Sequence, residues 1–302
     1  MNWRENDKYL ELITPDQFSF KECLVFLGRS ENECLHYILD GCLYKLIKID
    51  EAMILLKISS EAGILKIEFP DKYPSQIIRT SIAKYIWDLF DLDRDLVNFY
   101  SLASKDKILN MLVNKYHGLR IIGIPDLFEA LTWAIIGQQI NLAFAYTLKK
   151  RFVESFGEKI IYNGKDYWIY PEPEVVSKLQ VSDLTKLQFT TRKAEYVIGT
   201  AKLLASGEIN KEELLKIKNY NQVRDILLRI RGVGKWTADY VMMKCLKVPE
   251  AFPIADVGLH NALKLQLELD KKPSIEEIES ISLNWKGWED YATFYLWRSL
   301  YE

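Results

Sequence analysis

The sequence is poor in the residues that build metal centres. It contains three histidines, and its four cysteines lie far apart, at Cys23, Cys34, Cys42 and Cys245. The cysteines do not have the Cys-x2-Cys spacing of zinc or iron–sulfur ligands, and the histidines form no His-Glu-x2-His arrangement. These absences argue against a transition-metal enzyme, and scattered cysteines are typical of a reducing cytosol.

An excess of charge of one sign and a long apolar run are also absent. The chain has 40 Lys and Arg against 42 Asp and Glu, a formal net charge of −2. A role with nucleic acid therefore cannot depend on overall positive charge and would need a local site. No apolar run approaches the roughly 18 residues of a membrane span, and the first residues lack a signal-peptide pattern. We expect a cytoplasmic protein that does not enter a membrane.

Two hydrophobic patterns divide the chain. Between residues 22 and 69, turn-like residues separate the short apolar runs "CLVFL", "CLYKLIKI", "AMILLKISS" and "GILKIEFP", which predicts an antiparallel meander. From about Pro74 onward, apolar residues recur at spacings of three and four, which predicts helices. We predict an α+β fold, with an N-terminal domain over residues 1–115 and an all-helical domain over residues 116–302.

Local signals refine the helical part. Asp126 follows a proline and has Glu129 three residues later, a pattern typical of a capped helix that begins at "DLFEALTWAIIGQQI". The segment "YNGKDYWIYPEPEVV" is rich in turn-forming residues and is interpreted as an irregular crossing between helices.

The stretch "LLRIRGVGKWTADYVMM", residues 227–243, interrupts a helical pattern with two glycines. Gly232 and Gly234 permit a tight turn, after which a second helix begins. The free N–H groups and the dipole at the start of that helix would suit a phosphate oxygen. A purely structural helical hairpin explains the same pattern equally well.

A single acid, Asp256, lies about twenty residues further on in "AFPIADVGLH". It follows apolar residues and proline and precedes a helical pattern. One interpretation is a helix N-cap. The other is a carboxylate held in a partly desolvated pocket, where it could do chemistry.

Four segments in this order carry a family resemblance: "LFEALTWAIIGQQI", "RIRGVGKWTADYVMM", "AFPIADVGL" and "WKGWEDYATFYLWRSL". Together they resemble the helix-hairpin-helix (HhH-GPD) DNA glycosylase superfamily, most closely its AlkA type of 3-methyladenine DNA glycosylase. The similarity covers residues from about His117 to Tyr301. The N-terminal meander matches the family's small antiparallel sheet domain, which is of the TATA-binding-protein-like type.

The resemblance implies an enzyme that flips a damaged nucleotide out of duplex DNA and cleaves its N-glycosidic bond, leaving an abasic site. Asp256 matches the catalytic aspartate, whose carboxylate would stabilise the oxocarbenium character of the sugar and orient water. No cofactor is needed for that step. Trp236 occupies the position of the nucleophilic lysine of lyase-active members, and Lys235 should face elsewhere. We therefore expect a monofunctional glycosylase that does not nick DNA.

Three aromatic residues, Trp236, Tyr240 and Trp297, match positions that line the base pocket in AlkA-type enzymes. Trp236 and Tyr240 are four residues apart, which also suits an ordinary core stripe. In a pocket they would attract N3- and N7-alkylated purines, which carry a positive charge, through stacking and cation–π contact.

Further positions match groups that contact DNA. Gln139 matches the residue that the family inserts into the gap left by the flipped base, although AlkA has an apolar residue there; alternatively Gln138 and Gln139 are polar residues that close a helix. The phosphate-binding hairpin would comprise Gly232, Val233, Gly234, Lys235 and Thr237. The carbonyls of Leu228, Arg231 and Val233 match positions that hold a sodium or similar cation between hairpin and phosphate.

The favoured function is release of alkylated purines, 3-methyladenine and 7-methylguanine, from double-stranded DNA by a monomer. One alternative is a glycosylase for oxidised or deaminated purines such as 8-oxoguanine or hypoxanthine. Another is a non-catalytic helix-hairpin-helix module that binds DNA. Asp256 argues against the last, because a phosphate binder gains nothing from a negative charge near the DNA backbone.

Overall fold

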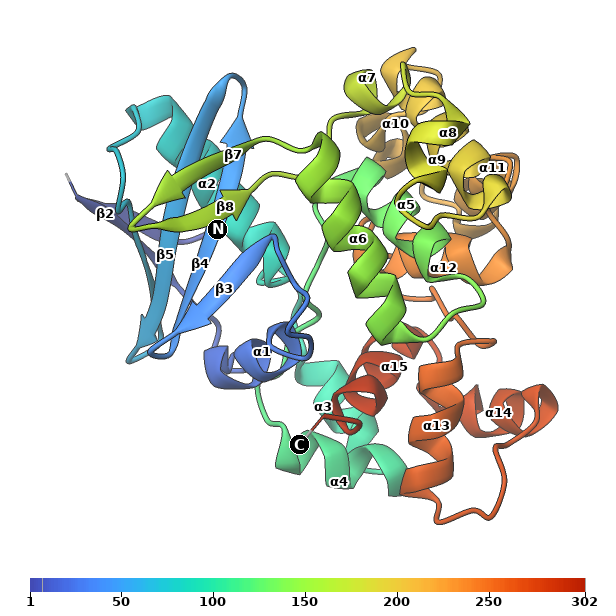
Figure 1. Ribbon diagram of the computed structural model, residues 1–302. Helices are drawn as coiled ribbons and strands as arrows, with labels where there is room; N and C mark the ends of the chain where they lie inside the picture. Colours follow the sequence, from blue (N-terminus) through green and yellow to red (C-terminus); the bar gives the residue numbers. More distant parts are fainter. Residues whose placement is uncertain (7, 302) are drawn as a thin grey trace.

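The computed structural model describes residues 1–6 and 8–301 of the chain (Figure 1). Before residue 116 the elements are β1 (Trp3–Glu5), β2 (Tyr9–Ile13), α1 (Phe20–Leu27), β3 (His36–Leu39), β4 (Cys42–Ile49), β5 (Ala52–Glu61), β6 (Ile64–Glu68), α2 (Gln76–Leu89), α3 (Val97–Ala103) and α4 (Lys107–Lys115). The later elements are α5 (Leu127–Gly137), α6 (Leu142–Phe156), β7 (Lys159–Tyr162), β8 (Lys165–Trp168), α7 (Pro173–Val176), α8 (Val181–Thr185), α9 (Thr191–Ala205), α10 (Lys211–Lys216), α11 (Tyr220–Leu228), α12 (Lys235–Lys244), α13 (Val257–Gln266), α14 (Ile275–Ser282), the 3-10 helix η1 (Leu283–Trp285) and α15 (Glu289–Arg298).

The predicted antiparallel sheet is confirmed. In the described part of the chain, β1 to β6 form one sheet in the order β1-β2-β6-β5-β4-β3. The turns Asp40–Gly41 and Ala62–Gly63 have positive φ at both residues, as two-residue hairpins with right-handed twist require. Helix α2 packs against β2 and β4 on one face of this sheet (Figure 1).

One predicted strand is wrong. The run "CLVFL" belongs to helix α1, whose first turn is capped by Ser19 through the N–H of Glu22. The buried residues of α1 are Phe20, Cys23, Phe26 and Leu27, which are spaced three and four apart. This helical period, together with the cap, outweighs the strand propensity of a short apolar run, because propensity is weaker than tertiary packing.

A hairpin was missed in the helical part. The segment interpreted as an irregular crossing contains β7 and β8, which pair through the turn Asn163–Gly164 with positive φ at both residues. Tyr167 of β8 is buried with Leu46 and Leu55 of the N-terminal sheet. Asn-Gly is the strongest short hairpin signal, so the sequence did contain the information. The hairpin lies across the N-terminal sheet and joins the two halves of the molecule (Figure 1).

The predicted helical part is confirmed, and helix α5 begins after Asp126 as expected. Asp126 Oδ1 accepts the N–H of Glu129 at 2.6 Å. The carboxylate of Glu129, expected to return this contact, lies 3.9 Å from the amine of Lys149.

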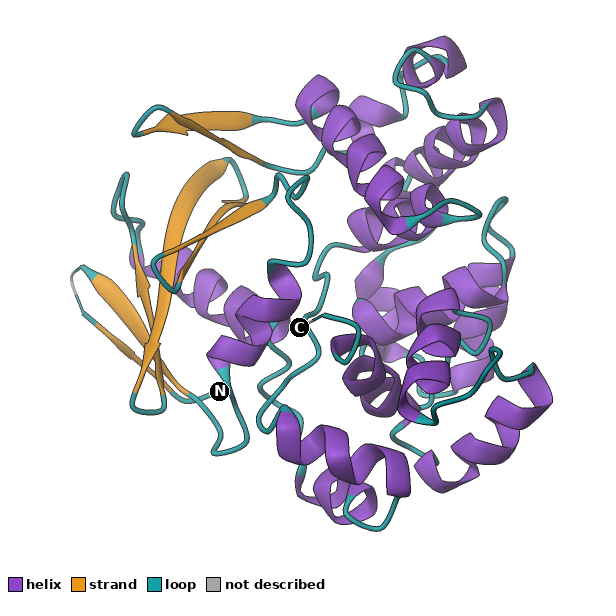
Figure 2. Cartoon of the chain, turned by 60° about the horizontal axis from the view of Figure 1, so that its bottom comes forward, coloured by secondary structure: helices purple, strands orange, loops and turns teal. Residues whose placement is uncertain are grey.

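The two halves share one core. Helices α3 and α4 precede residue 116, yet α4 packs against α15 near the C-terminus. One continuous hydrophobic cluster runs from Leu10 in β2 to Trp297 in α15. Figure 2 shows the sheet and the helices as adjoining layers. The boundary at residue 115 stays a prediction.

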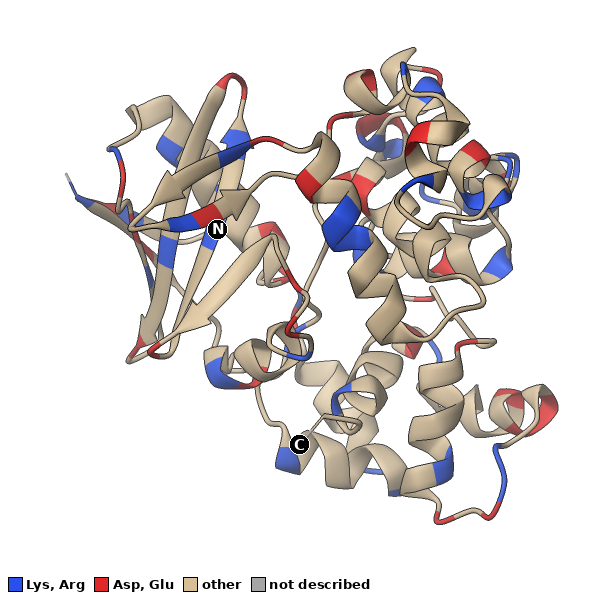
Figure 3. Cartoon of the chain, in the orientation of Figure 1, with Lys and Arg blue, Asp and Glu red and all other residues tan. Residues whose placement is uncertain are grey.

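The structure shows where the charged residues lie and whether any helix could span a membrane. Figure 3 shows acidic and basic residues interspersed over both halves of the chain. No helix among the described residues has the length and apolar character needed to cross a bilayer.

Candidate active site

The hairpin that contains the two glycines lies between α11 and α12. Gly232 has a φ of +96°, and a Cβ at this residue would lie 2.3 Å from the ring of Tyr196. Gly234 is the N-cap of α12. Glycine is therefore required at position 232 for two reasons: the left-handed backbone conformation and the close approach of the Tyr196 ring.

The hairpin presents the first turn of α12 to solvent. Gly234 and Lys235 are exposed, whereas Val233 is buried and holds the turn to the core. In the described part of the chain, the N–H groups of Lys235 and Trp236 have no backbone acceptor. Helix starts of this kind attract anions, because the free N–H groups and the dipole both favour negative charge.

Thr237, which belongs to the predicted phosphate-binding hairpin, has a buried side chain, and its contact with phosphate stays a prediction. Thr237 is 1% exposed, and its hydroxyl accepts a hydrogen bond from the amide of Gln138 at 2.9 Å. It therefore positions the hairpin from inside. The buried location follows from its place three residues after the N-cap, where the helix turns back toward the core.

Gln138 and Gln139 have different surroundings. The Gln138 amide also donates to the carbonyl of Gly232 at 2.8 Å, so it ties the end of α5 to the hairpin. Gln139 is exposed and has a φ of +55°, an uncommon value for a residue with a side chain. The turn thus directs Gln138 inward and leaves Gln139 projecting from the surface.

Asp256 is held by three N–H donors. It is the N-cap of α13, and its Oδ1 accepts the N–H of Leu259 at 2.8 Å. The indole Nε1 of Trp236 donates to Oδ2 at 2.9 Å, and that of Trp297 donates to Oδ1 at 2.8 Å. Asp256 is therefore a cap and, at the same time, a half-buried carboxylate fixed by residues from α12 and α15.

Gly258 makes room for this arrangement. A Cβ at Gly258 would lie 2.9 Å from Oδ1 of Asp256 and 3.3 Å from Nε1 of Trp297. A side chain here would push the carboxylate and the indole apart. The sequence places Gly258 two residues after Asp256, but only the structure shows that the indole of a distant helix passes over it.

The three aromatic residues form a row of tilted rings, called the aromatic stack below, with interplanar angles of 33° and 37°. The ring centroids of Trp236 and Tyr240 are 5.6 Å apart, and those of Tyr240 and Trp297 are 6.0 Å apart. A base inserted between two rings needs about twice a contact distance of 3.5 Å, so a base would pack on an outer face of this stack. The hydroxyl of Tyr240 accepts the indole N–H of Trp133 at 2.9 Å, and burial raises the pKa of Tyr240.

Helix α12 also contacts α11 through a buried acid. Tyr220 and Arg224 of α11 contact the carboxylate of Asp239 at 2.9 Å and 3.3 Å. Asp239 is 2% exposed, and burial raises its pKa to about 6. This acid lies about 60° around α12 from Trp236 and about 100° from Tyr240, and it was not identified from the sequence.

The hairpin carbonyls leave room for a hard cation. In the described residues, the carbonyls of Leu228, Arg231 and Val233 accept no backbone hydrogen bond outside the helices. Unpaired carbonyl oxygens are suitable ligands for sodium. Among the residues described, no group of three or more His, Cys, Asp or Glu side chains could hold a metal ion.

Several residues that contact Asp256, Tyr240 or the hairpin were not assigned to the site from the sequence. Trp133, Gln138 and Gly258 contact the site from α5 and α13, and each is an ordinary residue for a buried helix or a helix end. Arg29 and Lys244 lie close to Tyr240 and were also missed. Their importance depends on long-range packing, which a local pattern cannot indicate.

Family models match nearly the whole chain. Residues 132–288 match the model described as HhH-GPD superfamily base excision DNA repair protein. Residues 8–131 match the 8-oxoguanine DNA glycosylase N-terminal domain. The two matches meet inside α5, between residues 131 and 132, after the predicted boundary at residue 115.

Proteins with similar sequences include two DNA-3-methyladenine glycosylases. The chain is 46% identical to a DNA-3-methyladenine glycosylase of Bacillus subtilis (strain 168) over 304 residues, which cover 100% of both chains. It is 26% identical to DNA-3-methyladenine glycosylase 2 of Escherichia coli over 60% of each chain.

Two solved structures share the fold. The 3-methyladenine DNA-glycosylase from Archaeoglobus fulgidus has a TM-score of 0.82 and 23% identity, over 95% of this chain and 97% of that one. The Clostridium acetobutylicum 8-oxoguanine glycosylase/lyase in complex with double-stranded DNA has a TM-score of 0.77 and 20% identity, over 99% and 97%.

Proposed function

The chain belongs to the HhH-GPD superfamily of base excision DNA repair proteins, and from this premise we propose that it releases alkylated purines, such as 3-methyladenine and 7-methylguanine, from double-stranded DNA. It is a DNA glycosylase, which cleaves the bond between base and deoxyribose and leaves an abasic site. The observation that carries the proposal is the carboxylate of Asp256, fixed by two indole N–H groups beside an aromatic stack.

Asp256 acts on the sugar. As the base departs, the deoxyribose gains oxocarbenium character, and a nearby fixed carboxylate stabilises the positive charge without having to reorganise. A carboxylate has about four lone-pair positions, and the three N–H donors leave one for an incoming water. Asp256 can therefore orient the water that attacks the sugar.

The aromatic stack acts on the base. N3- and N7-alkylated purines are cationic, and the electron-rich faces of Trp236, Tyr240 and Trp297 attract them by roughly 0.5–2 kcal/mol for each good contact. The positive charge also makes the base a better leaving group. The positive charge of an alkylated base therefore explains both its selection by the aromatic rings and the easy cleavage of its glycosidic bond.

The hairpin and Gln139 hold the duplex. Free N–H groups at Lys235 and Trp236 bind a phosphate without reading sequence. The exposed side chain of Gln139 enters the gap left by the flipped base, where its amide can bond to the orphaned partner base. A sodium or similar cation at the carbonyls of Leu228, Arg231 and Val233 would join the hairpin to a phosphate oxygen.

The reaction stops at the abasic site. Trp236, at the position of the lyase nucleophile, cannot form a Schiff base, and its N–H is already bonded to Asp256. The exposed side chain of Lys235 extends from the adjacent position, about 100° around the helix. We therefore place the enzyme among monofunctional glycosylases, acting as a monomer.

A second substrate class has support of its own. The N-terminal residues 8–131 match a domain named for 8-oxoguanine DNA glycosylase. Removal of oxidised or deaminated purines is therefore the alternative activity. A non-catalytic DNA-binding module has no use for the fixed carboxylate of Asp256 near the DNA.

The test is base release from methylated duplex DNA. The wild-type chain is compared with Asp256→Asn and with Asp225→Asn, a matched control on the exposed surface of α11. We expect wild type and Asp225→Asn to release methylated purines and leave the strand intact, and Asp256→Asn to bind DNA without release. Binding by all three with no release by any would overturn the substrate assignment, and a panel of oxidised and deaminated duplexes would then test the alternative.

A further inference from the structure

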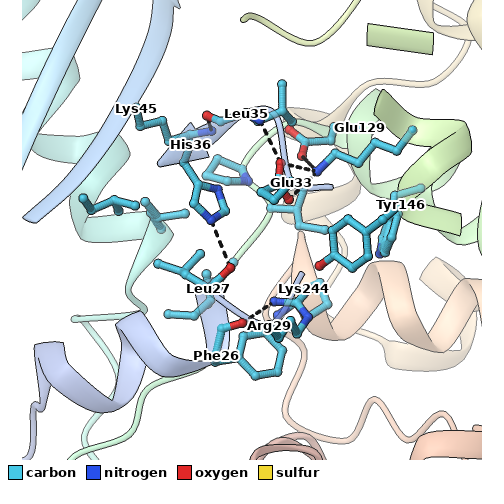
Figure 4. Close-up of a pocket in the computed structure, with 18 of the residues that line it drawn as sticks. Phe26, Leu27, Arg29, Glu33, Leu35, His36, Lys45, Glu129, Tyr146 and Lys244 are labelled. Carbon is cyan, nitrogen blue, oxygen red and sulfur yellow. Dashed lines mark hydrogen bonds and ion pairs between the residues drawn. The ribbon is translucent and has the colours of Figure 1, made fainter. Parts of the chain in front are cut away.

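A cavity of about 70 Å³ lies between the N-terminal half and the helical half (Figure 4), and Tyr240 of the aromatic stack is one of its lining residues. It is lined by an unusual number of charged side chains: Arg29, Glu33, Lys45, Glu129, Lys149 and Lys244. Lys149 and Lys244 are buried and the other four are partly buried, and such groups are costly to desolvate unless they are paired, neutral or still in contact with water.

The charges at one end of the cavity are paired. Lys149 lies 2.9 Å from Glu33 Oε2 and 3.9 Å from Glu129, and Glu33 also accepts the N–H groups of Cys34 and Leu35. Lys149 and these contacts hold the pKa of Glu33 well below its usual value. This end of the cavity is a satisfied structural ion pair.

Among the residues described, the two basic side chains at the other end make no ion pair, and burial and the charge of Arg29 lower the pKa of Lys244. Among the described residues, the guanidinium of Arg29 donates one hydrogen bond, to the carbonyl of Phe26 at 2.7 Å, and makes no ion pair. A guanidinium has five N–H donors. Lys244 is 3% exposed and contacts the rings of Phe26 and Phe294, with no hydrogen bond or ion pair in the same part of the chain. Figure 4 shows Arg29 and Lys244 together, away from Glu33 and Glu129.

These free donors lie next to the candidate active site. Trp236, Tyr240 and Lys244 are spaced by four residues along α12, so they lie on one face of the helix, and Tyr240 lines both the stack and the cavity. Arg29 lies 5.5 Å from the ring centroid of Tyr146. Arg29 and Tyr240 line the same cavity, and the ring centroid of Tyr240 lies 6.0 Å from that of Trp297, whose indole donates to Asp256.

The dimensions match a purine. One helical turn rises about 5.4 Å, and the distance from the glycosidic nitrogen of a purine to the substituent at C6 is about 4.6 Å, slightly less than one turn. A base whose sugar lies at Asp256, level with Trp236, would place its C6 edge about one turn further along α12. This position lies between Tyr240 and Lys244 along α12. Arg29 of the N-terminal half lines the same cavity as these two residues.

We infer that Arg29 is a specificity-determining residue that reads the C6 edge of the flipped purine, with Lys244 as a second donor, and that it favours 6-oxo purines over 6-amino purines. The inference rests on the proposed function. The N–H groups of Arg29 can donate to the O6 oxygen of 7-methylguanine or hypoxanthine. The amino group of 3-methyladenine is itself a donor and meets them unfavourably. Both methylated bases are cationic, so their common repulsion from Arg29 cancels in a comparison of the two.

The experiment uses one methylated duplex that contains both bases. Single-turnover release of 7-methylguanine and 3-methyladenine is measured for wild type, Arg29→Met and Arg29→Lys, with spontaneous loss subtracted. The control is Lys21→Met, which removes the same charge from the exposed face of α1. Circular dichroism and affinity for an abasic-analogue duplex check that each variant folds and binds.

We expect Arg29→Met to lower the ratio of 7-methylguanine to 3-methyladenine release at least about tenfold, the effect of one hydrogen bond to a charged group. Arg29→Lys should retain part of the ratio, and Lys21→Met all of it. Equal losses for both bases, or an unchanged ratio, would overturn the inference alone. If the wild-type chain releases neither base, the proposed function fails and the inference fails with it.

Discussion

At the scale of single residues, the site depends on two tryptophans that each have two roles. The rings of Trp236 and Trp297 flank Tyr240, and their indole N–H groups hold the carboxylate of Asp256. The aromatic faces can be kept by another ring, but the N–H donors cannot. The two roles can therefore be separated by substitution.

Trp297→Phe should slow base release while leaving DNA binding intact. The variant keeps an aromatic ring but removes one N–H donor to a charged group, worth about 1.5–3 kcal/mol, so we expect a roughly 10- to 100-fold lower single-turnover rate. The measurement is release from methylated duplex DNA at saturating enzyme. Trp168→Phe, in β8 far along the chain from the site, is the control. A rate equal to wild type would show that the indole N–H does not position Asp256.

At the scale of elements, the hairpin between α11 and α12 depends on backbone freedom and on space. Gly232 has both a positive φ and the ring of Tyr196 against it, whereas Gly207, at the end of α9, has a positive φ with nothing within 4 Å. Substituting alanine at Gly207 therefore measures the cost of a left-handed backbone alone, whereas alanine at Gly232 adds the steric clash with Tyr196.

Gly232→Ala should weaken DNA binding more than Gly207→Ala does. Both variants pay about 1 kcal/mol for a left-handed alanine, but only Gly232→Ala must also displace Tyr196 and so distort the turn that presents the free N–H groups. Affinity for an undamaged duplex, measured by fluorescence anisotropy at fixed salt, is the readout. Equal affinities for the two variants would mean that the hairpin does not contact phosphate.

Helices α11 and α12 are joined by an acid whose ionisation should affect stability. Burial raises the pKa of Asp239 from 3.8 to about 6. Because the folded-state pKa lies above the unfolded-state value, the folded chain binds the additional proton between about pH 4 and pH 6. The stability that Asp239 contributes at low pH is therefore lost as the pH rises through this window.

Asp239→Asn should remove this pH dependence. The difference in free energy of unfolding, wild type minus variant, should fall by about 2.4 kcal/mol between pH 4 and pH 7. Urea unfolding at several pH values measures it. Asp225→Asn, an exposed acid in α11, should follow the wild-type curve. Parallel curves for wild type and Asp239→Asn would contradict the raised pKa.

At the scale of the whole molecule, local patterns predicted elements and family motifs but not the contacts between distant segments. The helical body, the N-terminal sheet, the cap at Asp126 and the hairpin glycines follow from spacing and turn chemistry. The strand expected at "CLVFL" failed because a run of five apolar residues does not distinguish strand from helix. The burial of Thr237 depends on Gln138, 99 residues away, and no local pattern contains that information.

The free donors of Arg29 show the same limit for the site. Its position follows from packing of α1 and the next loop against α12, across more than two hundred residues of chain. The matching motifs in the helical half predicted Asp256 and its aromatic neighbours, yet the N-terminal half was expected to contribute only a sheet of unknown role. Its contribution to the base pocket appears only when the two halves are placed together.

The shared core predicts that the two halves unfold together. Arg120 has 0% exposure, and its guanidinium donates to the carbonyls of Gln17 and Asp91. Helix α4 packs on α15, so residues on either side of position 115 belong to one cluster. Separating them at that position would expose apolar surface on both halves.

We therefore expect a single thermal transition for the whole chain, despite two matched family models. Far-UV circular dichroism, which reports helices and strands, and tryptophan fluorescence, which reports mainly the helical half, should give coincident midpoints, and the calorimetric and van't Hoff enthalpies should agree. Separately produced fragments 1–115 and 116–302 should each be unfolded or aggregated. Two resolved transitions, or a folded fragment 116–302, would show that the helical half is an independent domain and that the N-terminal half contributes to the base pocket only by docking.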